Sequence, residues 1–413
     1  MEIVLGMYRL RDPGGTEHYT LIAAEQLQRL GHAVTIFVEE TGAMAELARS
    51  RGLLLATTED ELPDDVDVVY AQESITAYRL AAHYPKAPLV YGLHAVDYDL
   101  SVPPQLPELV SAYVTAHDRL SRRARALAVS AEVVRLRQPV DVARFTPRAS
   151  LREPPRRLLA LGNYLHGDRA RVIDDACARA GIEVLRVGAQ HGEPVLEAEQ
   201  VLNDADIVVG KARVIVEAMA CGRAAYVYDT FGSDGWVTTD SYARLEADNF
   251  SGQTGTPPVD VARLSSDLGL YRPDMGAANR ELAVVNHSAN RHAIELVELF
   301  ERLAPRRVSA ATPLRELGRL VRLQWQTEER AMSLAAEARS VREENERLRH
   351  RVLELEPLEP LAARVPELER YAGELAEGLR EARESLRAVL SQRRVRLGVA
   401  LARPIDLLRR FRR

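Results

Sequence analysis

The chain has 413 residues, a length that exceeds one ordinary domain and predicts two globular domains with additional sequence beyond them. Apolar residues make up 46% of the chain, which excludes wholesale disorder, and a formal net charge of -5 argues against a nucleic-acid-binding protein at the level of the whole chain. Cys177 and Cys221 are the only cysteines, too few for a disulfide framework or a zinc cluster, so we interpret them as buried thiols.

The N-terminal sequence is already typical of a strand and has no basic segment of the kind that opens a signal peptide. No apolar run approaches the roughly 20 residues that a membrane span needs. We therefore expect a cytoplasmic protein or one held peripherally on the inner face of the cell membrane.

Short apolar runs alternate with helical stretches through the first part of the chain. A helix is predicted at 16–30, where Gly31 ends it. Strands that alternate with helices favour parallel pairing, so the sequence predicts an α/β domain over residues 1–150. The predicted strands lie at 3–5, 34–38, 66–70, 89–93 and 126–129.

The alternation restarts after a polar, proline-containing stretch at 148–155, which we interpret as a hinge. It predicts a second α/β domain over residues 151–305, and its last helix is expected to close that domain. The predicted strands lie at 158–161, 184–187, 207–209 and 225–228, and the predicted helices at 169–180, 193–204, 214–221 and 290–303.

After Pro305 the composition changes to Glu, Arg, Leu and Ala, which predicts a helical region over 306–392. Apolar residues recur there every seven positions in the a/d pattern of a coiled coil. Two interpretations stay open: a homodimer through 331–355 with Asn345 fixing its register, or a helical hairpin folded on itself. The recurring residues are Leu334, Val341, Leu348 and Leu355, with Ala331, Ala338, Asn345 and Val352 at the companion positions.

The last segment, 393–413, carries eight arginines against the single Asp406, with apolar residues interleaved. This pattern predicts a basic amphipathic tail at an anionic membrane surface. A solvated, frayed terminus is the alternative.

Two features of the first domain follow strands, where a parallel α/β sheet binds its ligands. Gly14 and Gly15 precede the first helix, so the backbone can approach a ligand closely and free N–H groups face an anion. His94 follows the strand at 89–93 and could hydrogen-bond or carry a proton near neutral pH. An ordinary tight turn and a structural histidine are the alternatives.

The stretch 209–222 of the second domain combines a strand end, a Gly-Lys turn and a helix that carries a carboxylate. Lys211 and the helix N-terminus supply the positive charge that a diphosphate needs. Glu217 could accept hydrogen bonds from the two hydroxyls of a ribose. A buried or salt-bridged Glu217 is the alternative. Lys211 is also one of only two lysines among 55 basic residues, which makes its presence notable.

Three segments, taken together and in this order, resemble GT-B glycosyltransferases of family 4. They are GGTEHYTLIAAEQLQRLGHAVTIF from Gly14, QPVDVARFTP from Gln138 and VIVEAMACGRAAYVYD from Val214. The resemblance covers about residues 1–303. It implies two Rossmann-like domains that face each other across a cleft, with the donor nucleotide on the second and the acceptor on the first. It also implies a retaining transfer that needs no metal and no cofactor.

The resemblance assigns roles position by position. It gives Glu217 to the ribose, Gly14–Gly15 to the loop that faces the donor phosphates, and His94 to the active-site histidine near the transferred sugar. Lys211 or Arg169 would neutralise the leaving diphosphate.

Two positions depart from the family pattern. Val209 stands where the family usually has a second Glu, and Asn163 stands where it usually has an Arg. Both changes leave recognition of the donor sugar open. Lys211 could take over part of the missing cationic role.

The sequence thus predicts a glycosyltransferase that moves a sugar from a nucleotide-diphosphate donor to a glycan or lipid-linked acceptor in cell-surface polysaccharide synthesis. One alternative is a non-catalytic GT-B-like scaffold for a polysaccharide complex, which Val209 and Asn163 favour. A sugar-nucleotide epimerase on the same fold is another. A dehydrogenase is disfavoured, because no Gly-x-Gly-x-x-Gly motif with a downstream acid is present.

Overall fold

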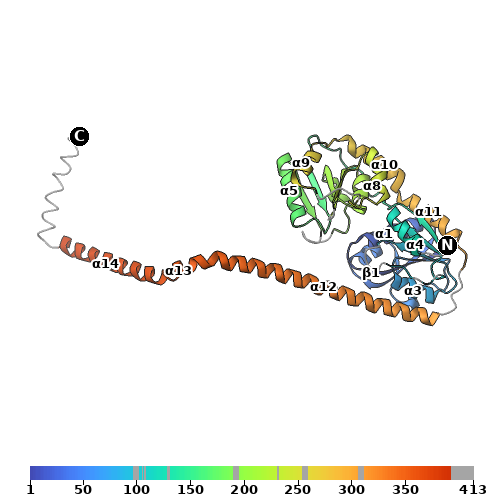
Figure 1. Ribbon diagram of the computed structural model, residues 1–413, viewed down its shortest axis with the longest axis horizontal. Coiled ribbons are helices and arrows are strands. Elements are labelled where there is room, and N and C mark those ends of the chain that lie inside the picture. Colours follow the sequence, from blue (N-terminus) through green and yellow to red (C-terminus); the bar gives the residue numbers. More distant parts are fainter. Residues whose placement is uncertain are drawn as a thin grey trace. The chain divides into compact units, whose positions relative to one another are not determined.

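The computed structural model describes residues 1–95, 102–104, 106, 108–127, 131–188, 195–229, 232–253, 259–305 and 311–391. The chain forms two compact units, Met1–Gln326 and Thr327–Arg413. The first unit contains two α/β lobes, built on a seven-stranded and a five-stranded sheet (Figure 1). The predicted α/β class with two Rossmann-like lobes and a helical extension is confirmed.

The sheet of the first lobe is entirely parallel, in the order β3-β2-β1-β4-β5-β6-β7. Strand β1, which lies inside the sheet between β2 and β4, is almost continuously apolar and buried, as expected for a parallel strand with both faces covered by helices. The elements are β1 (Glu2–Leu10), α1 (Gly15–Arg29), β2 (Ala33–Thr41), α2 (Ala43–Ser50), β3 (Leu54–Ala56), the 3-10 helix η1 (Glu59–Glu61), β4 (Val68–Ala71), α3 (Ser74–His83), β5 (Leu89–Leu93), β6 (Ala112–Thr115), α4 (Asp118–Leu127) and β7 (Glu132–Arg135).

The strand predicted at 126–129 is wrong. Ala126 and Leu127 end helix α4 instead, and residues 128–130 lie outside the described part of the chain. Leu120 and Ala124 are buried at helical spacing, and half-buried Leu127 extends the same face. Leu127 therefore belongs to a helical stripe.

The second sheet has the order β12-β11-β10-β8-β9, with β12 antiparallel and the other strands parallel. The helix predicted at 193–204 is reduced to α6, and 189–194 lie outside the described residues. The elements are β8 (Arg157–Leu161), α5 (Asp168–Ala180), β9 (Glu183–Val187), α6 (Glu199–Asn203), β10 (Ile207–Gly210), α7 (Arg213–Ala220), β11 (Ala224–Tyr228), β12 (Ser233–Trp236), α8 (Thr239–Ala247), α9 (Val261–Leu268) and α10 (Asp274–His287).

Asp206 fixes the predicted hinge at 148–155 to the second lobe. Its carboxylate, 1% exposed, accepts the backbone N–H groups of Arg152, Arg156 and Arg157 at 2.8 to 3.1 Å. Burial raises the pKa of Asp206, but the Arg152 guanidinium and these backbone bonds lower it, and together they hold it below its usual value. The stretch is therefore anchored at its C-terminal end, and the predicted domain boundary near 150 stays a prediction.

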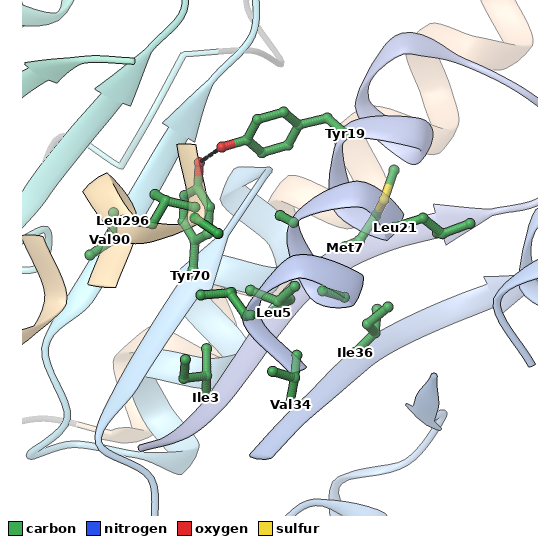
Figure 2. Packing of buried hydrophobic residues seen from close by; sticks show 14 of the residues in the cluster. Ile3, Leu5, Met7, Tyr19, Leu21, Val34, Ile36, Tyr70, Val90 and Leu296 are labelled. Carbon is green, nitrogen blue, oxygen red and sulfur yellow. Dashed lines mark hydrogen bonds between the residues drawn. The ribbon is translucent and has the colours of Figure 1, made fainter. Parts of the chain in front are cut away.

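Helix α11 (Ala289–Glu301) returns the chain to the first lobe. The Val140 N–H donates to the His287 carbonyl at 2.8 Å, and the Ala289 N–H donates to the Val140 carbonyl at 3.0 Å, so the outgoing and returning connections are hydrogen-bonded together. Figure 2 shows Leu296 of α11 within the core of the first lobe, near Tyr70. The buried side chains that α11 adds to this core are Ala293, Leu296, Leu299 and Phe300.

The expectation that this helix closes the second domain is therefore wrong, although a helix is present where the sequence predicts it. Its apolar face packs against α1, and Tyr19 of α1 hydrogen-bonds both Tyr70 at 2.6 Å and His292 at 2.9 Å. A 3.6-residue period identifies an apolar face but does not identify the core that receives it.

Helix α12 (Ala311–Leu355) begins on the first lobe. Leu314 is 4% exposed and belongs to the core around β4, β5 and α3, with Leu317 and Val321 packed against it. Arg322 pairs with Glu39 at 2.6 Å, and Arg315 approaches Glu59 at 3.5 Å. The sequence suggests a helical extension that is separate from the lobes. The structure differs, because the first four turns of α12 are part of the first unit.

The second unit continues α12 and adds a 3-10 helix η3 (Glu356–Leu358), α13 (Glu359–Ala362) and α14 (Val365–Ser391). Its large apolar side chains from Met332 to Val389 are 47% to 63% exposed. The described helices therefore do not bury each other as the hairpin interpretation requires. No described helix is long and apolar enough to span a bilayer. The basic tail predicted at 393–413 lies outside the described residues.

The docking of α12 is testable through one buried leucine. We expect Leu314→Ala to lower the free energy of unfolding by about 2–5 kcal/mol, because it leaves a cavity in the first-lobe core. The matched variant Leu320→Ala, on the same helix at a side chain that is 48% exposed, should change it by no more than about 0.5 kcal/mol. Urea unfolding of the full chain measures both values, and equal small effects would contradict the docking.

Candidate active site

The order of the first sheet brings the predicted residues of the first lobe to one edge. The chain leaves β1 for β2 on one side and reaches β4 on the other, so the crevice of the sheet opens at the carboxyl ends of β1 and β4. A cavity of ≈ 270 Å³ lies there, and we call it the first-lobe cavity. It is lined by Met7, Tyr8, Arg9, Thr16, Glu17, Gln72, Glu73, Tyr91, Gly92, His94, Ala95 and Trp325.

His94 follows β5 and lines this cavity. Its Nε2 lies 2.6 Å from the Oε1 atom of Gln72, and the ring of Tyr19 meets it edge-on at 5.0 Å. Burial lowers the pKa of His94 to about 4, so the ring is neutral near pH 7. With the Gln72 oxygen as acceptor, the proton sits on Nε2 and Nδ1 is the basic atom.

Gly14 and Gly15 form the N-terminus of α1, with no side chain capping it. A Cβ at Gly14 would meet the carboxylate of Glu17 at 2.1 Å, whereas one at Gly15 would meet no atom within 4 Å. Glu17 therefore lies over the helix end where the sequence predicts a phosphate. Burial raises the pKa of Glu17, and its own backbone N–H and Arg213 oppose this shift.

The second sheet also has a crevice, between the carboxyl ends of its adjacent strands β8 and β10. Each strand leads into a helix, and the residue just before that helix has an unusual backbone, with φ 61° and ψ -133° at Gly167 before α5 and φ 48° and ψ -123° at Ala212 before α7. The two helix N-termini therefore start at the same edge. Four side chains at this edge, Arg169, Lys211, Arg213 and Glu217, are called the donor cluster below.

Lys211 does not project freely from this edge. Its Nζ pairs with the buried carboxylate of Asp229 at 2.6 Å and lies 4.4 Å from the ring centroid of Tyr164. Asp229 is fully buried, and its second oxygen has no hydrogen-bond partner among the residues that the structure describes. Lys211 therefore neutralises a buried charge first, with 35% of its side chain still exposed.

Arg169 lies in the first turn of α5. Its guanidinium donates to the Tyr164 carbonyl at 3.4 Å. Tyr164 thus contacts both cations that the sequence assigns to the diphosphate, and it places Arg169 and Lys211 at the same edge.

Glu217 is 1% exposed and forms an ion pair with Arg213, one turn earlier on α7. Its Oε2 atom is buried without a hydrogen-bond partner among the described residues. Burial raises the pKa of Glu217, while Arg213 opposes this shift. An unpartnered carboxylate oxygen in a buried position carries a desolvation cost, which a ligand hydroxyl could relieve.

Arg213 is the functional candidate that the sequence interpretation missed. Besides holding Glu217, it acts electrostatically on Glu17 and His18 of the first lobe, where it opposes the raised pKa of Glu17 and adds to the burial that lowers the pKa of His18 to about 4. His18 in turn lies 3.0 Å from the Leu196 carbonyl of the second lobe. The available signal was its position four residues before Glu217 on the same helix face.

The structure therefore places the predicted residues in two groups. Arg169, Lys211 and Glu217 lie at the edge of the second sheet, and Gly14–Gly15 and His94 lie at the edge of the first. No cluster of three or more His, Cys, Asp or Glu side chains suited to a metal ion is found in the described part of the chain.

Solved structures of glycosyltransferases are similar to this chain over 73% of its length. The HepE protein of Anabaena in complex with UDP-glucose is 15% identical and matches 73% of this chain and 100% of its own, with a TM-score of 0.53. A glycosyltransferase from Rickettsia africae is 14% identical and matches 73% of this chain and 98% of its own, with a TM-score of 0.52. No protein-family model and no curated protein sequence matches. The similarity shows that the chain has the GT-B fold.

The backbone before α7 gives a stability prediction. Ala212 holds a positive φ that costs an L-residue about 1–3 kcal/mol and costs glycine little. We expect Ala212→Gly to raise the free energy of unfolding by about 1 kcal/mol. This value is the strain relieved in the folded state minus the larger conformational entropy that glycine loses on folding. The control Ala178→Gly, on the exposed face of α5, should lower it by about 1 kcal/mol. Denaturant unfolding of both variants measures the difference. A lower free energy of unfolding for both variants would exclude backbone strain at Ala212.

Proposed function

We propose that this chain is a glycosyltransferase that uses a nucleotide-diphosphate sugar. The observation that carries the proposal is the donor cluster, in which cations and a buried, half-satisfied carboxylate meet at two helix N-termini in the crevice of a GT-B lobe. The similarity to solved glycosyltransferases, one of them in complex with UDP-glucose, supports it.

In the proposed complex the donor replaces the ion pair between Arg213 and Glu217. The guanidinium turns to the diphosphate, and the carboxylate accepts hydrogen bonds from the ribose hydroxyls. Arg169, the exposed part of Lys211 and the N–H groups at the starts of α5 and α7 complete the anion site.

Transfer would proceed with retention and without a metal ion, as in family 4. The bond between the anomeric carbon and the phosphate oxygen breaks, and the acceptor oxygen bonds to the same face of that carbon. The acceptor proton passes to the departing phosphate, which the donor cluster stabilises. His94, neutral at pH 7, would orient a hydroxyl through its unprotonated Nδ1. The lobes would close by rotating about the two hydrogen-bonded connecting segments at Val140 and Ala289, and this closure would exclude water.

The acceptor and the cellular setting belong to the same proposal. A glycan or lipid-linked acceptor in cell-surface polysaccharide synthesis suits a protein with a coiled-coil stalk and a basic tail. The exposed apolar seam of α12 is suited to a homodimer through 331–355, and the arginines of 393–413 suit the anionic inner face of the cell membrane.

A non-catalytic scaffold remains the second candidate. Val209 is fully buried in β10 where the family has a carboxylate, and Glu17 covers Gly14, so two expected donor contacts are altered. Binding of a nucleotide without turnover would favour this role. Conversion of a nucleotide sugar without any acceptor would instead identify an epimerase.

Nucleotide binding tests the donor cluster directly. We expect the full chain to bind at least one of UDP, GDP and dTDP in calorimetry, and Glu217→Gln to weaken that binding by about 10-fold to 100-fold, since hydrogen bonds to a charged group contribute about 1.5–3 kcal/mol. Glu183→Gln, which changes an exposed carboxylate on β9 of the same lobe, is the control and should leave the affinity unchanged. Absent binding of all three nucleotides, or undiminished binding by Glu217→Gln, would refute the assignment.

The stalk and the tail have their own test. We expect the full chain to sediment as a dimer, and a chain in which Leu334, Val341 and Leu348 are changed to Ser to sediment as a monomer, because the apolar seam is lost. A chain that ends at Gln392 should lose its co-sedimentation with vesicles that contain phosphatidylserine but stay dimeric. Monomeric full-length protein would refute the dimer, and unchanged vesicle binding would refute the tail.

A further inference from the structure

The first-lobe cavity has one wall that the GT-B lobes do not supply. Trp325 belongs to α12, after the last element of the two lobes, and it lines the cavity together with residues of β1, β4 and β5. Its ring meets that of Tyr8 at a centroid distance of 6.0 Å and an interplanar angle of 64°. The start of the helical stalk is therefore part of this cavity.

The position of Trp325 is fixed by the helix that carries it. Leu314, Leu317 and Val321 bind α12 to the apolar core, and Arg322, three residues before Trp325, pairs with Glu39 at 2.6 Å. A side chain on a docked helix is held more firmly than one on a loop, so the indole forms a preorganised wall.

The lining of the cavity combines aromatic rings with polar side chains, most of which are uncharged or paired with an opposite charge. Burial raises the pKa of Glu73 to about 8 and lowers that of His94 to about 4, so both are mainly uncharged near pH 7. The guanidinium of Arg9 is paired with Glu40 at 2.8 Å. Gln72 adds an amide, and its oxygen lies beside His94.

Such a lining fits a sugar ring. Uncharged polar groups exchange hydrogen bonds with hydroxyls, and an aromatic ring packs against the apolar C–H face of a pyranose. At ≈ 270 Å³ the cavity is smaller than the roughly 300 Å³ at which sites for drug-sized ligands begin, so it holds one ring rather than a chain. An anionic sugar would bring a second carboxylate beside that of Glu17, which disfavours it.

We propose that Trp325 is a sugar-binding residue and that the stalk helix thereby completes a site for one uncharged pyranose. As an acceptor site it rests on the proposed glycosyl transfer; as a sugar-binding site it does not. The stalk then contributes to substrate recognition besides any role in assembly, since displacement of α12 from the first lobe would remove the wall of the site.

Fluorescence can test the binding itself, because the chain has only two tryptophans. Trp236 is 9% exposed in the second lobe and donates to the Asp267 carbonyl, so Trp236→Phe leaves Trp325 as the single reporter. We expect glucose, galactose, mannose or N-acetylglucosamine to change the emission of this variant saturably, and glucuronate to bind at least tenfold more weakly. No saturable change with any neutral pyranose, or equal binding of glucuronate, would overturn the proposal.

A second measurement separates this site from the donor cluster. In calorimetry of the full chain, Trp325→Ala should weaken the binding of the neutral pyranose about tenfold, whereas Trp325→Phe should retain most of it. Both variants should bind the nucleotide as the unaltered chain does, which also shows that they are folded. Pyranose affinity unchanged in Trp325→Ala would refute the role of Trp325. Loss of nucleotide binding in Glu217→Gln would not alter that conclusion, because this variant tests the donor cluster and not the pyranose site.

Discussion

Two buried carboxylates at the edge of the second sheet determine the character of the donor cluster. Glu217 and Asp229 are almost fully enclosed, and an unpaired charge in such a position is strongly destabilising. Each therefore holds one cation, Arg213 and Lys211 respectively, and each keeps one oxygen without a hydrogen-bond partner in the described part of the chain. The charges of the site thus neutralise one another, but two carboxylate oxygens can still accept hydrogen bonds. This arrangement suits a ligand that carries both hydroxyl groups and negative charge.

Much of the fold is accessible from the sequence because local patterns encode it. The alternation of apolar strands and helices, and a glycine such as Gly181 with φ 67° at the end of α5, mark most elements of the second lobe correctly. The failures have physical causes. The run at 126–129 is short and equally apolar in a helix or a strand, and the short strand β6 at 112–115 carries no alternation that distinguishes it.

The site is less accessible because its geometry depends on contacts distant in the chain. Lys211 and Glu217 are correctly placed at the edge of a sheet, but their pairing with Asp229 and Arg213 changes what each can offer to a ligand. Trp325 has the heptad-like surroundings of a stalk, and nothing in its neighbours indicates a cavity of the first lobe. Sequence periodicity identifies the apolar face of a helix. It does not identify which side chains from other parts of the chain bury that face or pair with its charges.

The return of α11 to the first lobe has a consequence for biosynthesis. Leu296 and Phe300 complete the core that Ile3 and Leu21 begin, and Leu314 completes the one beside it. A ribosome releases the entire second lobe before it releases these residues. The lobe that is translated first therefore finishes folding last, and the nascent chain has to keep its early strands from aggregating until translation has passed residue 314.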